Sequence, residues 1–358
     1  MDQSSLGHLP LVDSHLDLAE LVTLFGRDLT LSVAEIRKRE QRTAKQATVS
    51  LPELERGGIA VAVTTVTAGF LAQDVGPDFE PKSAIYHTPE QAEAQALTQI
   101  KLYESWVAQG RARLIKSVND LEHHLDLWQE DRKPGLVLLM EGADPIVHVR
   151  DLPRWWQLGL RLIGLTFGDT AYGIGVAGGS QGVFKQGGLT PAGVELLEQM
   201  AELGFSWDIS HLAEEGVWQG LDLKFPRVCA SHANARALTP TDRHLSDGVI
   251  RAVAGRGGVI GLVLYNGFLE PRWKEDRSIA VTLDEHLRCQ ASYMAGLCGW
   301  GHIGIGSDLD GGFGREESPL EIETIADLYK AGSAVPAEVR EAVLSTNWLN
   351  FLRASLPQ

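Results

Sequence analysis

The stretch LVDSHLD at residues 11–17 passes from a short apolar segment directly into His15 and Asp17. Side chains alternate between the two faces of a strand, so His-x-Asp at a strand end places both groups on the same side. Four more apolar runs end within a residue or so of a histidine or an acid, at Glu141, His211, His232 and Asp308. This repeated ending predicts that several parallel strands deliver metal-binding side chains to one face of a fold.

The apolar runs also predict the fold class. They are apolar on both faces, which indicates buried parallel strands. Between them lie helical segments such as 88–110 and 190–204, with Thr88 and Thr190 as N-caps. This alternation is typical of an α/β fold, and 358 residues suit a (β/α)₈ barrel with insertions. The runs occupy residues 9–14, 59–66, 113–118, 135–140, 161–167, 205–210, 227–231, 257–265 and 302–307.

One run exceeds what an eight-stranded barrel needs. We omit 113–118 because it leads directly into a polar helical segment, whose His123 and His124 we expect on a solvated face. No Ser- or Pro-rich linker divides the chain, and no repeat of 20–50 residues is visible. We therefore predict a (β/α)₈ TIM barrel of the metal-dependent hydrolase type, with residues 1–358 as a single domain.

Composition limits the partners. Lys and Arg number 32 and Asp and Glu 47, for a net charge of −15, which argues against nucleic acid and anionic lipid. The sequence has an odd number of cysteines, Cys229, Cys289 and Cys298, and no CxxC motif. This argues against a disulfide framework and for a reducing compartment. The sequence has neither an apolar run of about 18 residues nor a signal-peptide pattern at residue 1. We expect a cytoplasmic homodimer that binds neither nucleic acid nor membrane.

The five strand endings point to metal chemistry. Imidazole nitrogen and carboxylate oxygen are ligands of Zn²⁺. Three histidines and two carboxylates can hold two ions about 3.5–4 Å apart, with one carboxylate bridging them. Such a pair lowers the pKa of a bridging water and polarises a carbonyl, and a further carboxylate can carry the proton. The residue set therefore predicts hydrolysis of an amide-like bond.

Five motifs, DSHLD, MEGAD, DISH, ASHANARAL and IGSDLDGG in this order, resemble the membrane (renal) dipeptidases of the amidohydrolase superfamily. The resemblance extends from about residue 11 to the NWLNFLR segment near the C-terminus. It implies a zinc-dependent metallopeptidase that hydrolyses small dipeptides, including those with a D-residue at the C-terminal side, through a hydroxide activated by two zinc ions per chain. It also implies the ligands: His15 and Asp17 for one zinc, His211 and His232 for the other, and Glu141 as the bridge.

The resemblance assigns three further residues. Asp308 would be the catalytic proton shuttle. Arg243, in TPTDRHLSD, falls where the family has an arginine that receives the terminal carboxylate of the substrate, a task that suits the guanidinium fork. A surface charge is the alternative for Arg243. Tyr265, at the end of GGVIGLVLY, either lines the substrate pocket or packs in the core.

Two positions depart from the family pattern. A family histidine that contacts the substrate or its developing oxyanion is replaced by Phe167, which removes a stabiliser worth about 10²-fold or more. Either another group such as Tyr172 supplies the donor, or the natural substrate is not an ordinary dipeptide. His244 replaces the asparagine that follows the family arginine. Two alternative functions therefore remain: hydrolysis of another amide (an N-acyl amino acid, a lactam or a cyclic amide), or metal binding without turnover.

Residues 173–178 match the dinucleotide pattern G-x-G-x-x-G. That pattern requires a strand directly before it and a helix that opens on its last glycine. The expected helix begins only at Thr190, so we interpret 173–178 as a βα loop over the active-site face.

Overall fold

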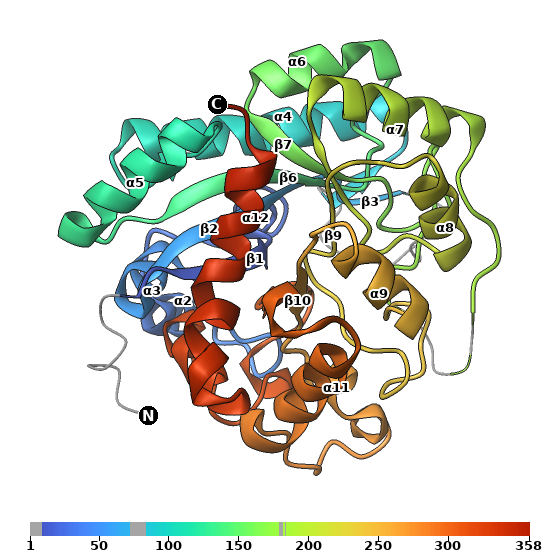
Figure 1. The fold of residues 1–358 in the computed structure, drawn as a ribbon. Helices are drawn as coiled ribbons and strands as arrows, with labels where there is room; N and C mark the ends of the chain where they lie inside the picture. The colour runs from blue at the N-terminus through green and yellow to red at the C-terminus, as the bar shows by residue number, and fades with distance from the viewer. Residues whose placement is uncertain (1–8, 72–83, 179–181, 183) are drawn as a thin grey trace.

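The computed structural model describes residues 9–71, 84–178, 182 and 184–358, with the strands at the centre and the helices around them (Figure 1). Two short strands, β3 (Phe70–Leu71) and β4 (Ile85–Tyr86), pair with each other, and β5 (Arg113–Leu114) pairs with β6 outside the barrel path. Among the described residues the barrel has eight strands: β1 (Leu11–Leu16), β2 (Ile59–Thr67), β6 (Gly135–Glu141), β7 (Leu160–Gly164), β8 (Ser206–Asp208), β9 (Val228–Cys229), β10 (Ile260–Leu262) and β11 (Ile303–Ile305).

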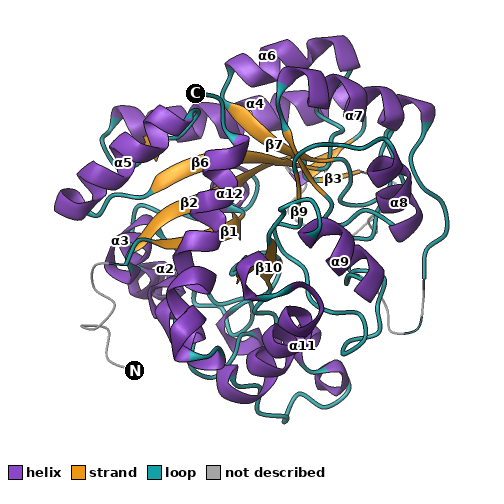
Figure 2. Ribbon diagram, in the orientation of Figure 1, coloured by secondary structure: helices purple, strands orange, loops and turns teal. Residues whose placement is uncertain are grey.

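The helices lie outside the strands (Figure 2). Thr88 and Thr190 cap their helices as predicted, because their side chains accept hydrogen bonds from the backbone N–H groups of Gln91 and Gly193. No helix in the described part of the chain has the length and apolar character needed to span a bilayer. The helices are α1 (Leu18–Thr23), α2 (Val33–Glu40), α3 (Leu51–Gly57), α4 (Pro89–Ala108), α5 (Val118–Asp131), α6 (Leu152–Gln157), α7 (Pro191–Leu203), α8 (Glu214–Asp222), α9 (Asp247–Ala254), α10 (Asn266–Leu269), α11 (Arg288–Cys298) and α12 (Asn347–Ser355).

The barrel strands run parallel. Ladders join β1 to β2, β2 to β6, β6 to β7, β7 to β8, β8 to β9, and β10 to β11. A single parallel bridge between Ala230 and Ile260 links β9 to β10. All nine residues of β2 are buried, which is the burial expected of a parallel strand covered on both faces.

Buried polar side chains close the seam between β11 and β1. Asp13 accepts a hydrogen bond from the Ser307 N–H at 2.9 Å, and the Ser14 hydroxyl lies 2.9 Å from the Ile305 carbonyl oxygen. A Cβ on Gly306 would come within 2.7 Å of Ser14 Oγ, so this approach of the two strands requires glycine. The seam carries β1 and β11 side by side to the same end of the barrel.

The predicted (β/α)₈ barrel is confirmed. Each of the eight retained runs overlaps a barrel strand, and the omitted run 113–118 supplies only β5. A cluster of buried apolar side chains extends from Leu11 to Leu344. On the basis of this shared core we propose that residues 1–358 form one domain.

The expectation for His124 is wrong. Its ring is buried and its Nε2 lies 2.8 Å from the Ala60 carbonyl oxygen, whereas the neighbouring His123 is exposed. The buried face of α5 carries Leu121, His124 and Trp128, spaced three and four residues apart. This is the helical period of a face packed on the barrel, which the polar composition of the segment concealed.

Candidate metal centre

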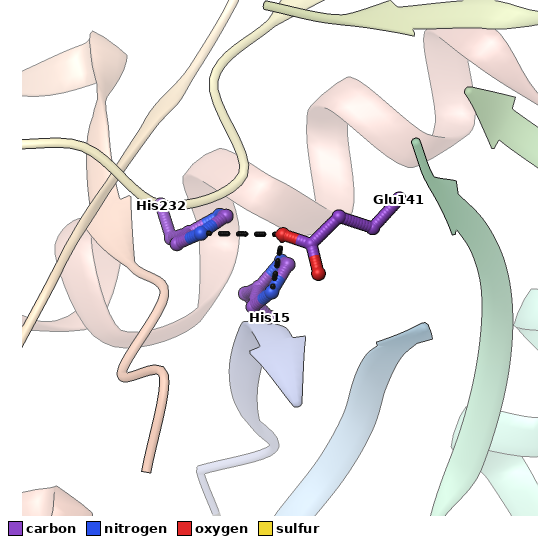
Figure 3. Close-up of side chains that lie close together, drawn as sticks. All are labelled: His15, Glu141 and His232. Atoms are coloured by element: carbon purple, nitrogen blue, oxygen red, sulfur yellow. Dashed lines mark ion pairs between the residues drawn. The ribbon is translucent and has the colours of Figure 1, made fainter. Parts of the chain in front are cut away.

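The site lies at the carboxyl ends of the barrel strands. His15 is the penultimate residue of strand β1, and Glu141 is the last residue of β6. His211 and His232 follow β8 and β9 within three residues, and Asp308 follows β11. Figure 3 shows His15 and His232 pointing at the carboxylate of Glu141. The barrel therefore brings together all the predicted metal-binding residues at the end where (β/α)₈ enzymes carry their active sites.

Three imidazole nitrogens surround one carboxylate oxygen. Glu141 Oε1 lies 3.4 Å from His15 Nε2, 3.1 Å from His211 Nε2 and 3.6 Å from His232 Nε2. Among the described residues, Glu141 Oε1 and His15 Nε2 are buried without a hydrogen-bond partner. Ligand atoms on a tetrahedral ion with bonds of about 2.0 Å are roughly 3.3 Å apart. The spacing and the unsatisfied atoms both fit a metal ion.

A second group of potential ligand atoms includes both aspartates. In this second group, ligand atoms from His15, Asp17 and Asp308 all lie within 4.8 Å of one another. In the first group, ligand atoms from His15, Glu141 and His232 also lie within 4.8 Å of one another. His15 Nε2 is 3.6 Å from Asp17 Oδ1, which also accepts a 2.6 Å hydrogen bond from the Thr65 hydroxyl. His15 is thus common to both groups, and Asp308 lies beside the ligands expected for the first ion.

Burial controls the protonation of this cluster. It raises the pKa of Asp17 to about 7, to which the charge of Glu141 contributes, and it raises the pKa of Glu141 to about 8. Burial also lowers the pKa values of His15, His211 and His232 well below their usual range, and neighbouring positive groups add to this effect. These shifts favour the uncharged forms. A divalent cation at this place would instead favour ionised carboxylates and neutral imidazoles, the forms that bind metal.

Hydrogen bonds set the tautomers of the three histidines. The Ser231 hydroxyl donates to Asp208 Oδ2, and it lies 3.0 Å from His15 Nδ1 and 2.8 Å from His232 Nδ1. Because its one proton is directed to Asp208, Ser231 Oγ accepts from both Nδ1–H groups. His211 Nδ1 lies 2.9 Å from a carbonyl oxygen, which can only accept. All three rings therefore present an Nε2 lone pair to the centre.

The acceptor for His211 is the carbonyl of Val176, within the segment 173–178. Ala177 and Gly178 line the main cavity. The interpretation of this segment as a loop over the active-site face therefore agrees with the structure. His211 itself has φ 65°, a left-handed conformation that is uncommon outside glycine, and this backbone turn directs its ring to the centre.

Asp308 also has a left-handed backbone, with φ 60°. A Cβ on Gly311 would come 1.8 Å from Asp308 Oδ1, so glycine is needed beside this carboxylate. Burial raises the pKa of Asp308 well above its usual value, the charges of Asp17 and Glu141 raise it further, and Arg243 opposes this shift. The carboxyl group is therefore suited to hold a proton near neutral pH.

Asp310 supports the loop behind Asp308. It is buried, pairs with Arg27 Nη1 at 3.0 Å, and accepts hydrogen bonds from the backbone N–H groups of Thr48 and Val49 at 2.9 Å. Both of its oxygens are engaged by these partners and by the Thr48 hydroxyl, which indicates a structural role for Asp310.

Arg243 is a buried residue of the site and not a surface charge. Its side chain is 3% exposed, and its Nη2 lies 2.9 Å from His211 Nε2 and 3.0 Å from the carbonyl oxygen of His232. Its Nε and Nη1 have no hydrogen-bond partner in the described part of the chain. Two buried N–H donors of a residue that lines the cavity are thus available to a ligand carboxylate.

A cavity of about 470 Å³ lies over the centre and is lined by Arg243, Tyr265 and Phe268, among others. The Tyr265 ring packs 5.1 Å from the Phe268 ring, so this tyrosine lines the cavity and also contacts the core. Phe167 lines the same cavity, with its ring 4.8 Å from His211. Phe167 therefore occupies space directly beside the metal ligands.

Neither Tyr172, the expected replacement donor, nor His244, the second departure from the family pattern, lines the main cavity. The Tyr172 hydroxyl donates to the Ile146 carbonyl oxygen, and the ring is buried away from the centre, so Tyr172 does not supply a donor to the substrate. His244 is also buried and packs against Phe268 outside the cavity lining. Tertiary packing buries both side chains, which the sequence pattern could not show. Of the two departures, only Phe167 changes the cavity wall.

Sequence reasoning did not identify Ser231, Asp208 and Glu20. Ser231 and Asp208 stand inside the quoted motifs ASHANARAL and DISH, one and three residues before a histidine ligand. Glu20 follows Asp17 by three residues in the first turn of α1 and lines the main cavity. The available signal for Glu20 was this helical spacing, which places residues i and i+3 on one side.

The chain matches the family model described as membrane dipeptidase (peptidase family M19) over residues 3–354. An uncharacterized protein in the pqqA 5' region of Klebsiella pneumoniae is 32% identical over 254 residues, which is 68% of this chain and 89% of that protein. An uncharacterized dipeptidase of Schizosaccharomyces pombe is 25% identical over 310 residues, 85% of this chain and 70% of that protein.

The fold is similar to that of a metallo peptidase from Rhodobacter sphaeroides, whose crystal structure is liganded with a phosphinate mimic of the dipeptide L-Ala-D-Ala. The TM-score is 0.76 at 22% sequence identity, and the match covers 97% of this chain and 99% of that chain. At this identity the likeness shows a common barrel fold.

Proposed function

This chain belongs to the membrane dipeptidase family, peptidase family M19, and is a metal-dependent dipeptidase, and we propose that it hydrolyses small dipeptides with two zinc ions at the centre around Glu141. The observation that carries the proposal is the convergence of three histidine Nε2 atoms on Glu141 Oε1, at 3.1–3.6 Å. Such a buried arrangement has no evident structural purpose, because it leaves Glu141 Oε1 without a hydrogen bond.

We assign five residues to the two ions. Imidazole and carboxylate donors suit zinc, and their neutral and ionised forms, respectively, are those that bind it. When bound, such ions supply the Lewis acidity that polarises a carbonyl group and lowers the pKa of water. The assignment is His15 and Asp17 for one ion, His211 and His232 for the other, and Glu141 between them.

The remaining polar side chains would orient the substrate and move the proton. Arg243 offers its free Nε and Nη1 to the terminal carboxylate. Asp308 accepts a proton on its carboxylate and returns it to the leaving amine, a task for which its raised pKa suits it. Phe167 and Tyr265 form parts of the cavity wall that would contact the substrate and exclude water.

A second candidate is hydrolysis of another amide, such as an N-acyl amino acid, a lactam or a cyclic amide. Phe167 favours it, because an apolar ring stands where the family pattern has a histidine. The same metal centre and shuttle would serve this reaction. Dipeptides with a D-residue at the C-terminal side remain among the proposed substrates of the first candidate.

We also propose a homodimer in the cytoplasm. Two-fold dimers are the commonest soluble oligomers. The odd number of cysteines and the lack of a CxxC motif support a reducing compartment.

The proposal is tested by elemental analysis of the purified protein together with zinc-dependent hydrolysis of L,L, L,D and D,D dipeptides and of N-acyl amino acids. We expect about two zinc ions per chain and turnover of dipeptides. His232→Ala should lose metal and activity, whereas His123→Ala, at an exposed position of α5, should keep both. Bound metal with turnover of N-acyl amino acids alone would favour the second candidate, and metal without any turnover would indicate a binding protein. Absence of metal after zinc is supplied would overturn the proposal.

A further inference from the structure

Glu20 is an acid of the main cavity that the proposed reaction does not use. It stands in the first turn of α1, three residues after Asp17, and lines the cavity together with Phe70 and Phe167. The helix thus places Asp17 and Glu20 on one side, with Asp17 toward the metal centre and Glu20 one turn further along the wall.

The Glu20 carboxylate has no partner within the protein. In the part of the chain that the structure describes, no hydrogen bond or ion pair to it is formed. By contrast, Asp13 accepts from Ser307, and Asp310 accepts from Thr48 and pairs with Arg27. Glu20 is half-buried, and holding a partly desolvated carboxylate without a partner is costly, so this unpaired acid on the cavity wall is available to a ligand group.

Nearby charges increase that cost. Burial raises the pKa of Glu20 well above its usual value, and the charges of Asp17 and Glu141 raise it further. A positive group beside Glu20 would favour its ionised form. Arg27, which lines the same cavity, does not serve, because its guanidinium is engaged with Glu40 and Asp310.

The cavity also holds the complementary charge. Arg243 keeps two unpaired donors and, like Glu20, lines the cavity that Glu141 also lines. No ion pair joins Glu20 to Arg243, so both are available to one ligand that contacts the centre at Glu141. A dipeptide is such a ligand, since it carries an ammonium and a carboxylate up to about 7 Å apart with a single peptide bond between them.

We propose that Glu20 binds the α-ammonium group of the substrate, so that the site selects dipeptides with a free amino terminus over N-acylated or des-amino amides. This inference deepens the proposed function and rests on it. The peptide carbonyl then lies over the metal ligands, while Glu20 and Arg243 hold the two ends.

The test compares Glu20→Gln, which keeps size and removes the charge, with Glu317→Gln. Glu317 lines the same cavity but already pairs with Arg277 at 2.7 Å, which makes it the matched control. Calorimetry on zinc-loaded protein measures the Kd of a phosphinate analogue of Ala-Ala and of the same analogue without its amino group. Kinetics compare Ala-Ala with propionyl-Ala, and elemental analysis checks that zinc content is unchanged.

We expect the wild type and Glu317→Gln to bind the amino analogue 10- to 100-fold more tightly than the des-amino analogue, and Glu20→Gln to bind both equally. The KM of Glu20→Gln for Ala-Ala should rise, with a smaller change in kcat. Equal binding of the two analogues by the wild type, or binding of neither, overturns the inference, as does an equal loss for both in Glu20→Gln. A Glu20→Gln effect confined to Lys-Ala would also overturn it, because it would assign Glu20 to a basic side chain. Failure of the proposed function is distinct: the wild type would then bind the analogues but hydrolyse no dipeptide.

Discussion

The Ser231 hydroxyl lies 2.8 Å from Nδ1 of His232 and, through the same oxygen, 3.0 Å from Nδ1 of His15. Its proton is directed to Asp208, whose other oxygen accepts a 2.8 Å hydrogen bond from the Ser231 N–H. One serine thereby fixes the tautomers of two ligands that belong to strands far apart in the sequence. Outer hydrogen bonds of this kind orient metal-binding imidazoles and raise their basicity.

Replacement of Ser231 by alanine should therefore weaken metal binding by about 10- to 100-fold, because two rings lose the acceptor that holds their Nδ1–H groups. Zinc affinity measured by competition with a chelator checks this. Ser210→Ala should weaken zinc binding less, because Ser210 Oγ contacts the His232 backbone N–H and Ser231 Oγ but no imidazole ring. Equal zinc affinity of Ser231→Ala and wild type would show that the ring orientation does not depend on this hydroxyl.

Replacement of Arg243 by lysine should lower kcat/KM for Ala-Ala by about 10²-fold, because a point charge cannot present the two donors that Nε and Nη1 offer. The C-terminal amide of Ala-Ala, which lacks the carboxylate, should be affected much less. Steady-state kinetics on both substrates and the zinc content of the variant provide the measurement. An equal loss for both substrates would contradict a carboxylate anchor and indicate that Arg243 acts on its neighbour His211.

Replacement of Phe167 by histidine should raise kcat for dipeptides by about 10-fold or more, because an N–H donor would then face the cavity beside His211. Phe167→Leu keeps the wall apolar and serves as the control for altered packing. Turnover of Ala-Ala and of N-acetyl-Ala by both variants checks the prediction. A gain with N-acetyl-Ala alone would speak against dipeptides as the preferred substrates.

His124 should make the stability of the protein depend on pH. Burial lowers its pKa to about 4 against the ordinary 6.5, despite the hydrogen bond to the Ala60 carbonyl oxygen. Between these values the unfolded chain binds a proton that the folded protein does not, so stability is full above pH 6.5 and falls as the pH drops toward 4. The loss amounts to about 3 kcal/mol.

Denaturant unfolding at pH 7 and at pH 4.5 measures this loss. His124→Gln cannot titrate, so its unfolding free energy should fall less than that of the wild type over the same interval. His123→Gln, at the exposed neighbouring position, should behave like the wild type. If all three proteins lose the same free energy, the buried ring has no part in the acid sensitivity.

Much of the barrel was predictable because its signals are local. The apolar runs, the N-caps Thr88 and Thr190, and the position of a histidine or acid after each strand are all read over a few neighbouring residues. The parallel topology then follows from strand–helix alternation. The prediction for His124 failed for the same reason: its burial depends on which side of α5 meets the barrel, and the local composition is polar.

The sequence by itself determined the barrel and the group of residues that the strand ends deliver, since strand and helix periodicity depend on near neighbours. Only the tertiary structure decided how those ends meet. His15 and Ser231 are 216 positions apart and touch because barrel closure brings β1 and β9 to a common end. The same closure buries Arg243, turns Tyr172 away and leaves Phe167 and Glu20 on the cavity wall. Distances between strand ends arise from packing in three dimensions, which local patterns do not encode.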